Sequence, residues 1–220
     1  MPSLQSALLA GASGLVGREL AAQWVGPGPL HLLVRRALQG TPPSHRVHVV
    51  DFSALPPLPA ADAAFCCLGT TIQVAGSQEA FRAVDFDAVR AFARAAQGAG
   101  VRRFGVVSAL GANAKSSVFY NRVKGEMEAE LQRMGFARLV IARPSLLARN
   151  RAATGQPARL GERITLAMTA PFTPLIPKAW RPIQAATMAR ALLLALAQDG
   201  PAVQVLESAQ LQELGRDLSA

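Results

Sequence analysis

Short apolar runs alternate with longer amphipathic stretches along the chain up to about residue 144. The apolar runs cover residues 8–10, 30–34, 47–50, 63–68, 103–107 and 137–142. They are almost continuously apolar instead of alternating with polar positions, which predicts strands buried on both faces, as in a parallel sheet. Helices are expected between them, near residues 15–24, 77–97 and 118–134. The first two helices run into Gly-rich segments that end them.

This alternation predicts an α/β fold, with a doubly wound parallel sheet and helices on both of its faces. The rhythm changes after Pro144, because residues 145–182 are rich in proline around one expected helix near 161–169. That segment should form a small C-terminal lobe on the substrate side of the sheet. The last part of the chain predicts a helix, a strand and a terminal helix, at 183–198, 203–206 and 208–214. A length of 220 residues fits a single domain with this lobe appended.

The composition excludes several classes of protein. Half of the residues are hydrophobic, which is too high a fraction for a disordered chain. No apolar run approaches the roughly 18 residues that a membrane helix requires, and the first ten residues lack the basic leader of a secretory signal. Cys66 and Cys67 are adjacent and would point to opposite faces of a strand, where they cannot form an ordinary disulfide. A reducing cytoplasm is therefore the expected location.

A formal net charge of +9 raises the question of an anionic partner. The basic residues are spread over the chain and aromatic residues make up only 5% of it, a combination that disfavours nucleic-acid binding. One segment holds a single acid, Glu162, among its arginines, which are Arg138, Arg143, Arg149, Arg151, Arg159 and Arg163. This segment is a candidate lining for an anionic substrate site. The chain has only three histidines, His31, His45 and His48, and no ligand-like cluster beyond them, so no metal is expected.

Three glycines spaced three apart follow the first strand and precede the first helix. The segment consists of Gly11, Ala12, Ser13, Gly14, Leu15, Val16 and Gly17. Gly11 would allow a tight turn, Gly14 would leave room for a phosphate, and Gly17 would let the helix pack closely on the sheet. The amides and dipole at the helix start would attract the anion. The segment predicts a dinucleotide pyrophosphate site; the alternative, in a chain with 18 glycines, is a chance match with a purely structural role.

Ligands of an open parallel sheet bind beyond the carboxyl ends of its strands, so the residues just after each strand are further candidates. These residues are Arg35, Arg36, Asp51, Phe52, Leu68, Gly69, Thr70, Ser108 and Pro144. At the position of Arg35 an NAD site usually carries an acid for the ribose 2′-hydroxyl, whereas arginine suits a 2′-phosphate. The predicted cofactor is therefore NADP(H), with two surface arginines as the alternative. Asp51 would accept from the adenine amino group, with Phe52 beside the ring, or would cap a turn.

Ser108, Tyr120 and Lys124 form the candidate catalytic group. Tyr120 is the only tyrosine of the chain, and Lys124 follows it by one helical turn on the same face. The ammonium charge of Lys124 is expected to lower the pKa of the Tyr120 phenol from its reference of about 10, which would make Tyr120 an acid–base group. A tyrosine and a lysine at this spacing can equally be an idle pair. The serine at a strand end and the glycine turn favour the catalytic interpretation.

With these pieces the chain resembles the atypical short-chain dehydrogenases/reductases, members of the Rossmann-fold superfamily with a Ser and Tyr-x-x-x-Lys active site. The resemblance rests on the segments GASGLVG, LVRR, CLGTT, VDFDAV, AGVRRFGVVSALGAN, YNRVKGEMEAEL and RPSLL. More narrowly, the chain is similar to the Tat-interacting-protein-like branch of small NADPH-binding members. That similarity rests on CCLGTT, the block from SALGAN to YNRVKGEMEAEL, and the tail VQVLESAQLQEL.

The resemblance implies that Ser108 hydrogen-bonds a substrate carbonyl, that Tyr120 gives or takes a proton, and that Lys124 lowers the Tyr120 pKa and binds the nicotinamide ribose. Backbone groups would meet the nicotinamide amide around Pro144, Ser145, Leu146 and Leu147. The expected function is an NADP(H)-dependent oxidoreductase acting on a small carbonyl or alcohol substrate. The alternative is a non-catalytic NADPH-binding sensor, and the short substrate lobe disfavours a nucleotide-sugar epimerase.

Overall fold

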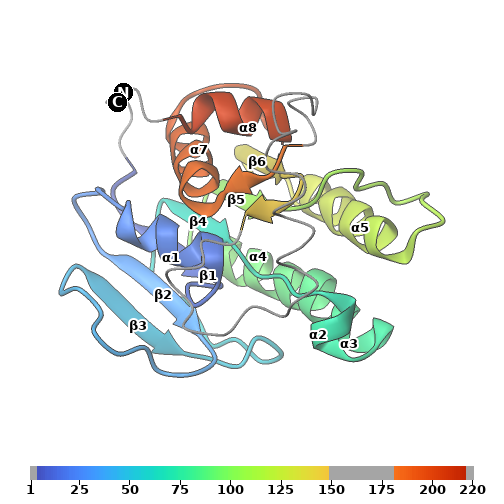
Figure 1. The fold of residues 1–220 in the computed structure, drawn as a ribbon. Helices are drawn as coiled ribbons and strands as arrows, with labels where there is room; N and C mark the ends of the chain where they lie inside the picture. The colour runs from blue at the N-terminus through green and yellow to red at the C-terminus, as the bar shows by residue number, and fades with distance from the viewer. Residues whose placement is uncertain (1–3, 149–180, 217–220) are drawn as a thin grey trace, which may run out of the picture.

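A seven-stranded parallel sheet forms the centre of the molecule in the computed structural model, which describes residues 4–148 and 181–216 (Figure 1). The strand order is β3-β2-β1-β4-β5-β6-β9. The strands are β1 (Ala7–Ala10), β2 (Leu30–Val34), β3 (His45–Val49), β4 (Ala63–Cys66), β5 (Arg103–Val107), β6 (Arg138–Arg143) and β9 (Val203–Glu207). From β1 the chain adds β2 and β3 towards one edge of the sheet. It then returns to the centre with β4 and adds β5, β6 and β9 towards the other edge. This reversal opens a crevice at the carboxyl ends of β1 and β4.

Helices cover both faces of the sheet, as the sequence predicts. Their bounds are α1 (Leu15–Ala22), α2 (Ile72–Ala75), α3 (Gln78–Arg82), η1 (Ala83–Ala88), α4 (Val89–Gly98), α5 (Phe119–Arg133), α7 (Ala185–Ala197) and α8 (Ser208–Leu214). Figure 1 shows α1, α7 and α8 on one side of the sheet and α4 and α5 on the other. Successive strand residues therefore enter different cores: Leu9 packs with α1 and α7, whereas Leu8 and Ala10 pack with α4 and α5.

The expected elements form with small shifts of their ends. The helix predicted near residues 77–97 is continuous, but its middle turn, η1, is π-helical. The strand predicted at 63–68 ends at Cys66, which leaves Cys67 and Leu68 in the loop at the carboxyl edge. Both cysteines are free, and they pack into the cores on opposite faces of the sheet, as expected.

The substrate-side lobe is only partly described. A short parallel pair, β7 (Leu147–Ala148) and β8 (Ile183–Gln184), marks its beginning and end. The expected helix near 161–169 lies outside the described residues, as do Arg149, Arg151, Arg159 and Arg163. Arg138 is buried within β6 and donates hydrogen bonds to Pro201 and Ala195, so it supports the fold instead of facing a ligand. Within residues 4–148 and 181–216, no helix combines the length and the apolar character needed to cross a membrane.

Aromatic side chains fill the core beneath α4 and α5. The Phe104 ring of β5 is fully buried and stacks on Phe136 with ring centroids 4.8 Å apart. Its other neighbour is Phe92 of α4, at a centroid distance of 5.7 Å. This cluster attaches the helix layer to the sheet, because the Phe104 ring of β5 contacts both α4 and the segment between α5 and β6.

We expect Phe104→Ala to lower the free energy of unfolding by about 3–5 kcal/mol, because it removes a buried ring and leaves a cavity. Urea denaturation monitored by circular dichroism measures this change. Val25→Ala is the control, since Val25 is 94% exposed, and its effect should stay within about 0.5 kcal/mol. A loss below about 1 kcal/mol in Phe104→Ala would contradict the assigned packing.

Candidate functional site

The glycine turn brings the end of β1 against the loop after β4. Gly11 has a φ of +84°, and a Cβ atom placed on it would lie 2.4 Å from the carbonyl oxygen of Cys67. A Cβ on Gly17 would lie 2.2 Å from the carbonyl oxygen of Gly11. The turn closes with a hydrogen bond of 3.0 Å from the Gly14 amide to the Gly11 carbonyl, and α1 begins directly afterwards. The predicted strand–turn–helix arrangement is therefore confirmed, because only glycine fits at both contact positions.

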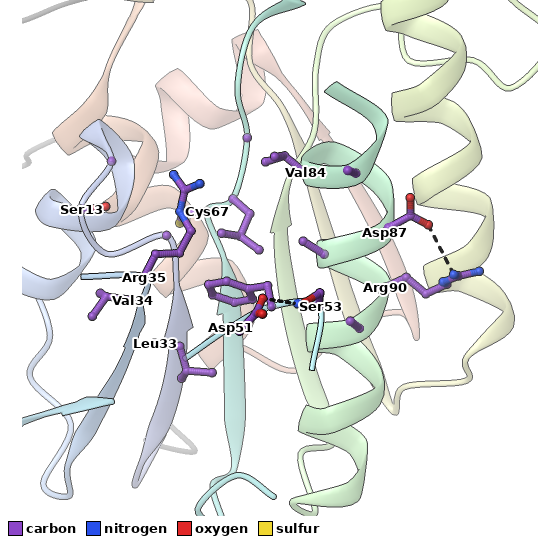
Figure 2. A pocket seen from close by; sticks show the side chains of 18 of the residues that line it. Ser13, Leu33, Val34, Arg35, Asp51, Ser53, Cys67, Val84, Asp87 and Arg90 are labelled. Atoms are coloured by element: carbon purple, nitrogen blue, oxygen red, sulfur yellow. Dashed lines mark hydrogen bonds and ion pairs between the residues drawn. The ribbon is translucent and has the colours of Figure 1, made fainter. Parts of the chain in front are cut away.

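A cavity of about 680 Å³ opens next to this turn, at the carboxyl ends of β1, β2 and β4 (Figure 2). This is within the usual size range of small-molecule and cofactor sites. Eight of the predicted cofactor residues line it: Gly11, Ser13, Gly14, Arg35, Asp51, Phe52, Leu68 and Gly69. The turn, the end of β2 and the loop after β4 thus meet around one cavity.

Other predicted cofactor residues lie outside the cavity lining. Ala12 and Val16 are buried in the core beneath α1, and Leu15 packs against the same core. Gly17 is covered by the turn itself. Arg36 is exposed beyond the end of β2, and the Thr70 amide is engaged with Asp85. The first four residues therefore support the glycine turn from the core side. Arg36 and Thr70 lie next to lining residues in the sequence but do not line the cavity themselves.

Several lining residues escaped the sequence analysis. One set comes from η1 and α4: Ala83, Val84, Asp87, Ala88, Arg90, Ala91 and Arg94. A second set comes from the strand ends and their loops: Leu33, Val34, Ser53 and Cys67. The signal for the first set is a mostly small-residue helix face within and after the segment VDFDAV, at spacings of three and four residues. The spacing of these residues places them on one helix face. It does not indicate whether that face borders the cavity or packs against the sheet.

Arg35 lines the cavity and has no counter-ion among residues 4–148 and 181–216. It is exposed at the end of β2, and no other described residue forms an ion pair or hydrogen bond with it. Arg90 and Arg94 also line the cavity, but they pair with Asp87 and Glu130 at 3.3 Å each. In Figure 2 Arg35 stands on the opposite side of the cavity from Arg90. A phosphate entering here would meet the guanidinium group of Arg35, which is not paired with any residue of the described ranges.

Asp51 caps the turn after β3. Its Oδ1 accepts a hydrogen bond of 2.9 Å from the Ser53 amide, and this bond lowers the pKa of the carboxyl group. The turn-capping alternative is therefore confirmed, while the proposed contact with an adenine amino group remains a prediction. Phe52 is buried and lines the cavity beside it.

Lys124 lies directly behind the cavity wall. A Cβ placed on Gly69 would be 3.9 Å from Lys124 Nζ and 3.5 Å from Asp85 Oδ1. These two charged atoms are 2.7 Å apart, and both side chains are buried. The two atoms pair as charges without the alignment of a hydrogen bond. Lys124 therefore lies next to Gly69, which lines the cavity.

The Tyr120 phenol does not shift as the sequence predicted. Burial raises its pKa most, the carboxylate of Asp85 raises it further, and the Lys124 ammonium lowers it. The expectation that Lys124 gives Tyr120 a lowered pKa is thus wrong in its net direction, because desolvation and Asp85 outweigh the ammonium charge. The ring packs beside Phe81, with centroids 5.4 Å apart.

Ser108 has a hydrogen-bond partner that the sequence did not suggest. Its hydroxyl donates to Glu128 Oε1 at 2.5 Å, and the same carboxylate accepts from Arg143 Nε at 3.0 Å. Arg143 also binds Glu207, and its pKa is raised chiefly by its hydrogen bonds to Glu128. Because a serine hydroxyl carries one proton, Ser108 cannot donate to a substrate carbonyl in this arrangement.

The segment after β6 is held by the C-terminal elements. Ser145 Oγ donates to the Arg181 carbonyl at 2.6 Å and accepts from Ser208 Oγ at 3.0 Å. The carbonyls of Pro144 and Leu146 accept from the amides of Leu110 and Ile183. The Leu146 side chain is exposed, and Leu147 belongs to β7. None of these four residues lines the cavity, so their expected contact with a nicotinamide amide remains a prediction.

The arrangement fits the phosphate-bearing half of a dinucleotide. Glycines fill the positions where a side chain would block the turn, the cavity has the size of a ligand site, and Arg35 has no counter-ion among the described residues. The Lys124 ammonium lies beside Gly69 in the same wall, and Tyr120 precedes Lys124 by one turn of α5. The cavity is therefore suited to a nucleotide ligand, with one amine and one phenol in the neighbouring helix α5.

Comparison with known proteins agrees with this geometry. A family model described as NAD(P)H-binding matches residues 11–167. Protein HTATIP2 of Rattus norvegicus is 33% identical over 97% of this chain and 90% of its own length. The structure of MoeE5 in complex with UDP-glucuronic acid and NAD superposes with a TM-score of 0.69 at 18% identity, covering 91% of this chain and 75% of that one. The last likeness shows that the two folds are the same.

A further relative corrects the expected location. Protein FMP52 of Debaryomyces hansenii is 33% identical over 64% of this chain and 66% of its own length, and it is named as mitochondrial. Other fungal FMP52 proteins that match carry the same designation. The prediction of a cytoplasmic location is therefore contradicted, because cysteine usage alone does not distinguish one reducing compartment from another. By its fold, its glycine turn and these matches, the chain belongs to the NAD(P)H-binding family of Rossmann-type α/β proteins.

Proposed function

We propose that this protein is an NADP(H)-dependent oxidoreductase acting on small carbonyl or alcohol substrates. The observation that carries the proposal is the position of Lys124, which lies behind Gly69 in the wall of the nucleotide cavity. Tyr120 precedes it by one turn on the same face of α5. This proximity of Lys124 to Gly69 supports the proposal, because hydride transfer to a carbonyl group requires a cofactor site and a proton donor close together.

Each residue has a distinct task in this proposal. The glycine turn and the start of α1 hold the pyrophosphate, and Arg35 holds the additional phosphate of NADP(H). The bound cofactor supplies or accepts the hydride. Tyr120 exchanges a proton with the substrate oxygen, and Lys124 lies where it can meet ribose hydroxyls. Arg143 is paired with Glu128 and Glu207, so an anionic substrate would have to compete with two carboxylates there.

A second candidate function is a non-catalytic NADPH-binding sensor. The Ser108 hydroxyl is committed to Glu128, and the Lys124 ammonium is paired with Asp85. Both groups are thereby occupied within the protein instead of being turned towards a substrate. A sensor would keep the cavity and its Arg35 while using neither group for turnover.

Replacing Arg35 with alanine should weaken NADPH binding about 10- to 100-fold, because a charge-assisted contact with the 2′-phosphate is lost. NADH affinity should change less than about threefold, since NADH has no such phosphate. Fluorescence titration of both cofactors measures the difference. Arg36→Ala is the matched comparison, because it removes the same charge one residue outside the cavity lining. Equal losses in the two variants, or a preference of the wild-type protein for NADH, would contradict the phosphate role of Arg35.

Tyr120→Phe should reduce turnover by about 100-fold or more, because the phenol proton is lost while the ring remains. NADPH affinity should stay within about threefold of wild type, since the hydroxyl makes no hydrogen bond to any described residue and the packing on Phe81 is kept. NADPH oxidation with a panel of aldehydes, ketones and quinones gives the rates. Unchanged turnover in this variant would remove Tyr120 from the mechanism. NADPH binding by the wild type without turnover on any of these substrates would favour the sensor.

A further inference from the structure

One buried carboxylate, that of Asp85, connects the cavity wall to α5. Asp85 is fully buried, and its Oδ2 accepts a hydrogen bond of 2.9 Å from the Thr70 amide. Its Oδ1 lies 2.7 Å from Lys124 Nζ. Thr70 directly follows Gly69, which lines the cavity. The same side chain therefore holds both the loop that faces the nucleotide site and the cation behind that loop.

The π-helical turn accounts for the position of Asp85. Within η1, Ala83, Val84, Asp87 and Ala88 line the cavity, whereas Asp85 and Phe86 are buried. A π-helical turn contains more residues than an α-helical turn, so it changes which side chains face each neighbour. Such turns recur at functional sites. Here the turn lets one short segment form the cavity wall and also place a carboxylate against Lys124.

Asp85 counteracts part of the effect of Lys124 on the Tyr120 pKa. Among the described residues, the charged groups that act on the phenol are Lys124 from its own helix and Asp85 from η1. From α3, Phe81 contributes an apolar ring, and the neighbouring Arg82 is paired with Glu126 of α5. Burial and Asp85 together raise the Tyr120 pKa despite the ammonium group. The phenol is therefore protonated at neutral pH.

We propose that Asp85 is a positioning residue: it holds Thr70 and Lys124 in place and counteracts part of the ammonium charge beside Tyr120, so that the Tyr120 hydroxyl can donate its proton when a carbonyl substrate is reduced. This proposal rests on the proposed function. In that step the carbonyl carbon receives a hydride from the reduced cofactor and the C=O π bond opens. The carbonyl oxygen takes the proton of the Tyr120 hydroxyl, and water restores that proton. The substrate class is then an aldehyde or ketone, and the product is an alcohol.

The experiment uses the fact that Tyr120 is the only tyrosine. The ultraviolet absorbance of tyrosinate therefore reports on this phenol alone, without substrate or cofactor. The protein is jumped from neutral pH to a series of alkaline values, and the absorbance is read before unfolding. In Asp85→Asn the titration midpoint should fall below that of wild type, because the ammonium group remains and the carboxylate charge is gone. Glu126→Gln is the control. It removes a carboxylate from α5, the helix that carries Tyr120, and should leave the Tyr120 midpoint unchanged.

Two further variants keep the test decisive if Asp85→Asn does not fold. Lys124→Met should raise the midpoint above that of wild type, and adding Asp85→Asn to it should lower the midpoint again. An unchanged or higher midpoint on removing Asp85, in either background, overturns the proposal.

Activity separates this inference from the proposed function. Carbonyl reduction by the wild type should be lost as the pH rises through the Tyr120 titration, and Asp85→Asn should lose it at a lower pH. If the protein binds NADPH but reduces no carbonyl, the oxidoreductase function fails while the absorbance titrations still decide the effect of Asp85. If reduction occurs but the midpoints do not follow the expected order, the inference about Asp85 fails alone.

Discussion

The functional part of this molecule depends on the close approach of two backbones at the carboxyl edge of the sheet. The turn after β1 meets the loop after β4 where a Cβ on Gly11 would lie 2.4 Å from the Cys67 carbonyl. This contact sits where the strand order reverses, so the crevice, the start of α1 and the loop carrying Gly69 all depend on it. A side chain at Gly11 would separate the two segments and change both walls of the cavity.

Next to this contact, α5 carries a row of polar side chains into the protein interior. Tyr120, Lys124 and Glu128 follow one another at intervals of four residues and therefore share a face. Lys124 pairs with Asp85, and Glu128 binds Ser108 and Arg143. Buried charges are stable only when they are paired, so each partner restricts the positions of the others. The row thereby ties η1, β5 and β6 to one helix and sets the electrostatic environment of the single tyrosine.

Much of the fold followed from the sequence, for reasons visible at particular residues. Continuous apolar runs such as Leu30–Val34 predict parallel strands because both faces are covered. The glycine spacing predicted a turn that admits no side chain, and the structure has that turn. The charge partners were not predictable in this way. Lys124 stands four residues from Tyr120 in the sequence, but Asp85, which counteracts it, comes from a helix segment much earlier in the chain.

The sequence by itself therefore determined the order of the elements, the steric requirement for glycine at the turn, and the family to which the chain belongs. These depend on the local periodicity of apolar residues and on glycines, which have no side chain. Both can be read from short stretches of neighbouring residues. Only the tertiary structure decided which residues of α4 line the cavity, where the proton of Ser108 points, and in which direction the pKa of Tyr120 moves. These depend on burial and on charges that packing brings together from distant parts of the chain.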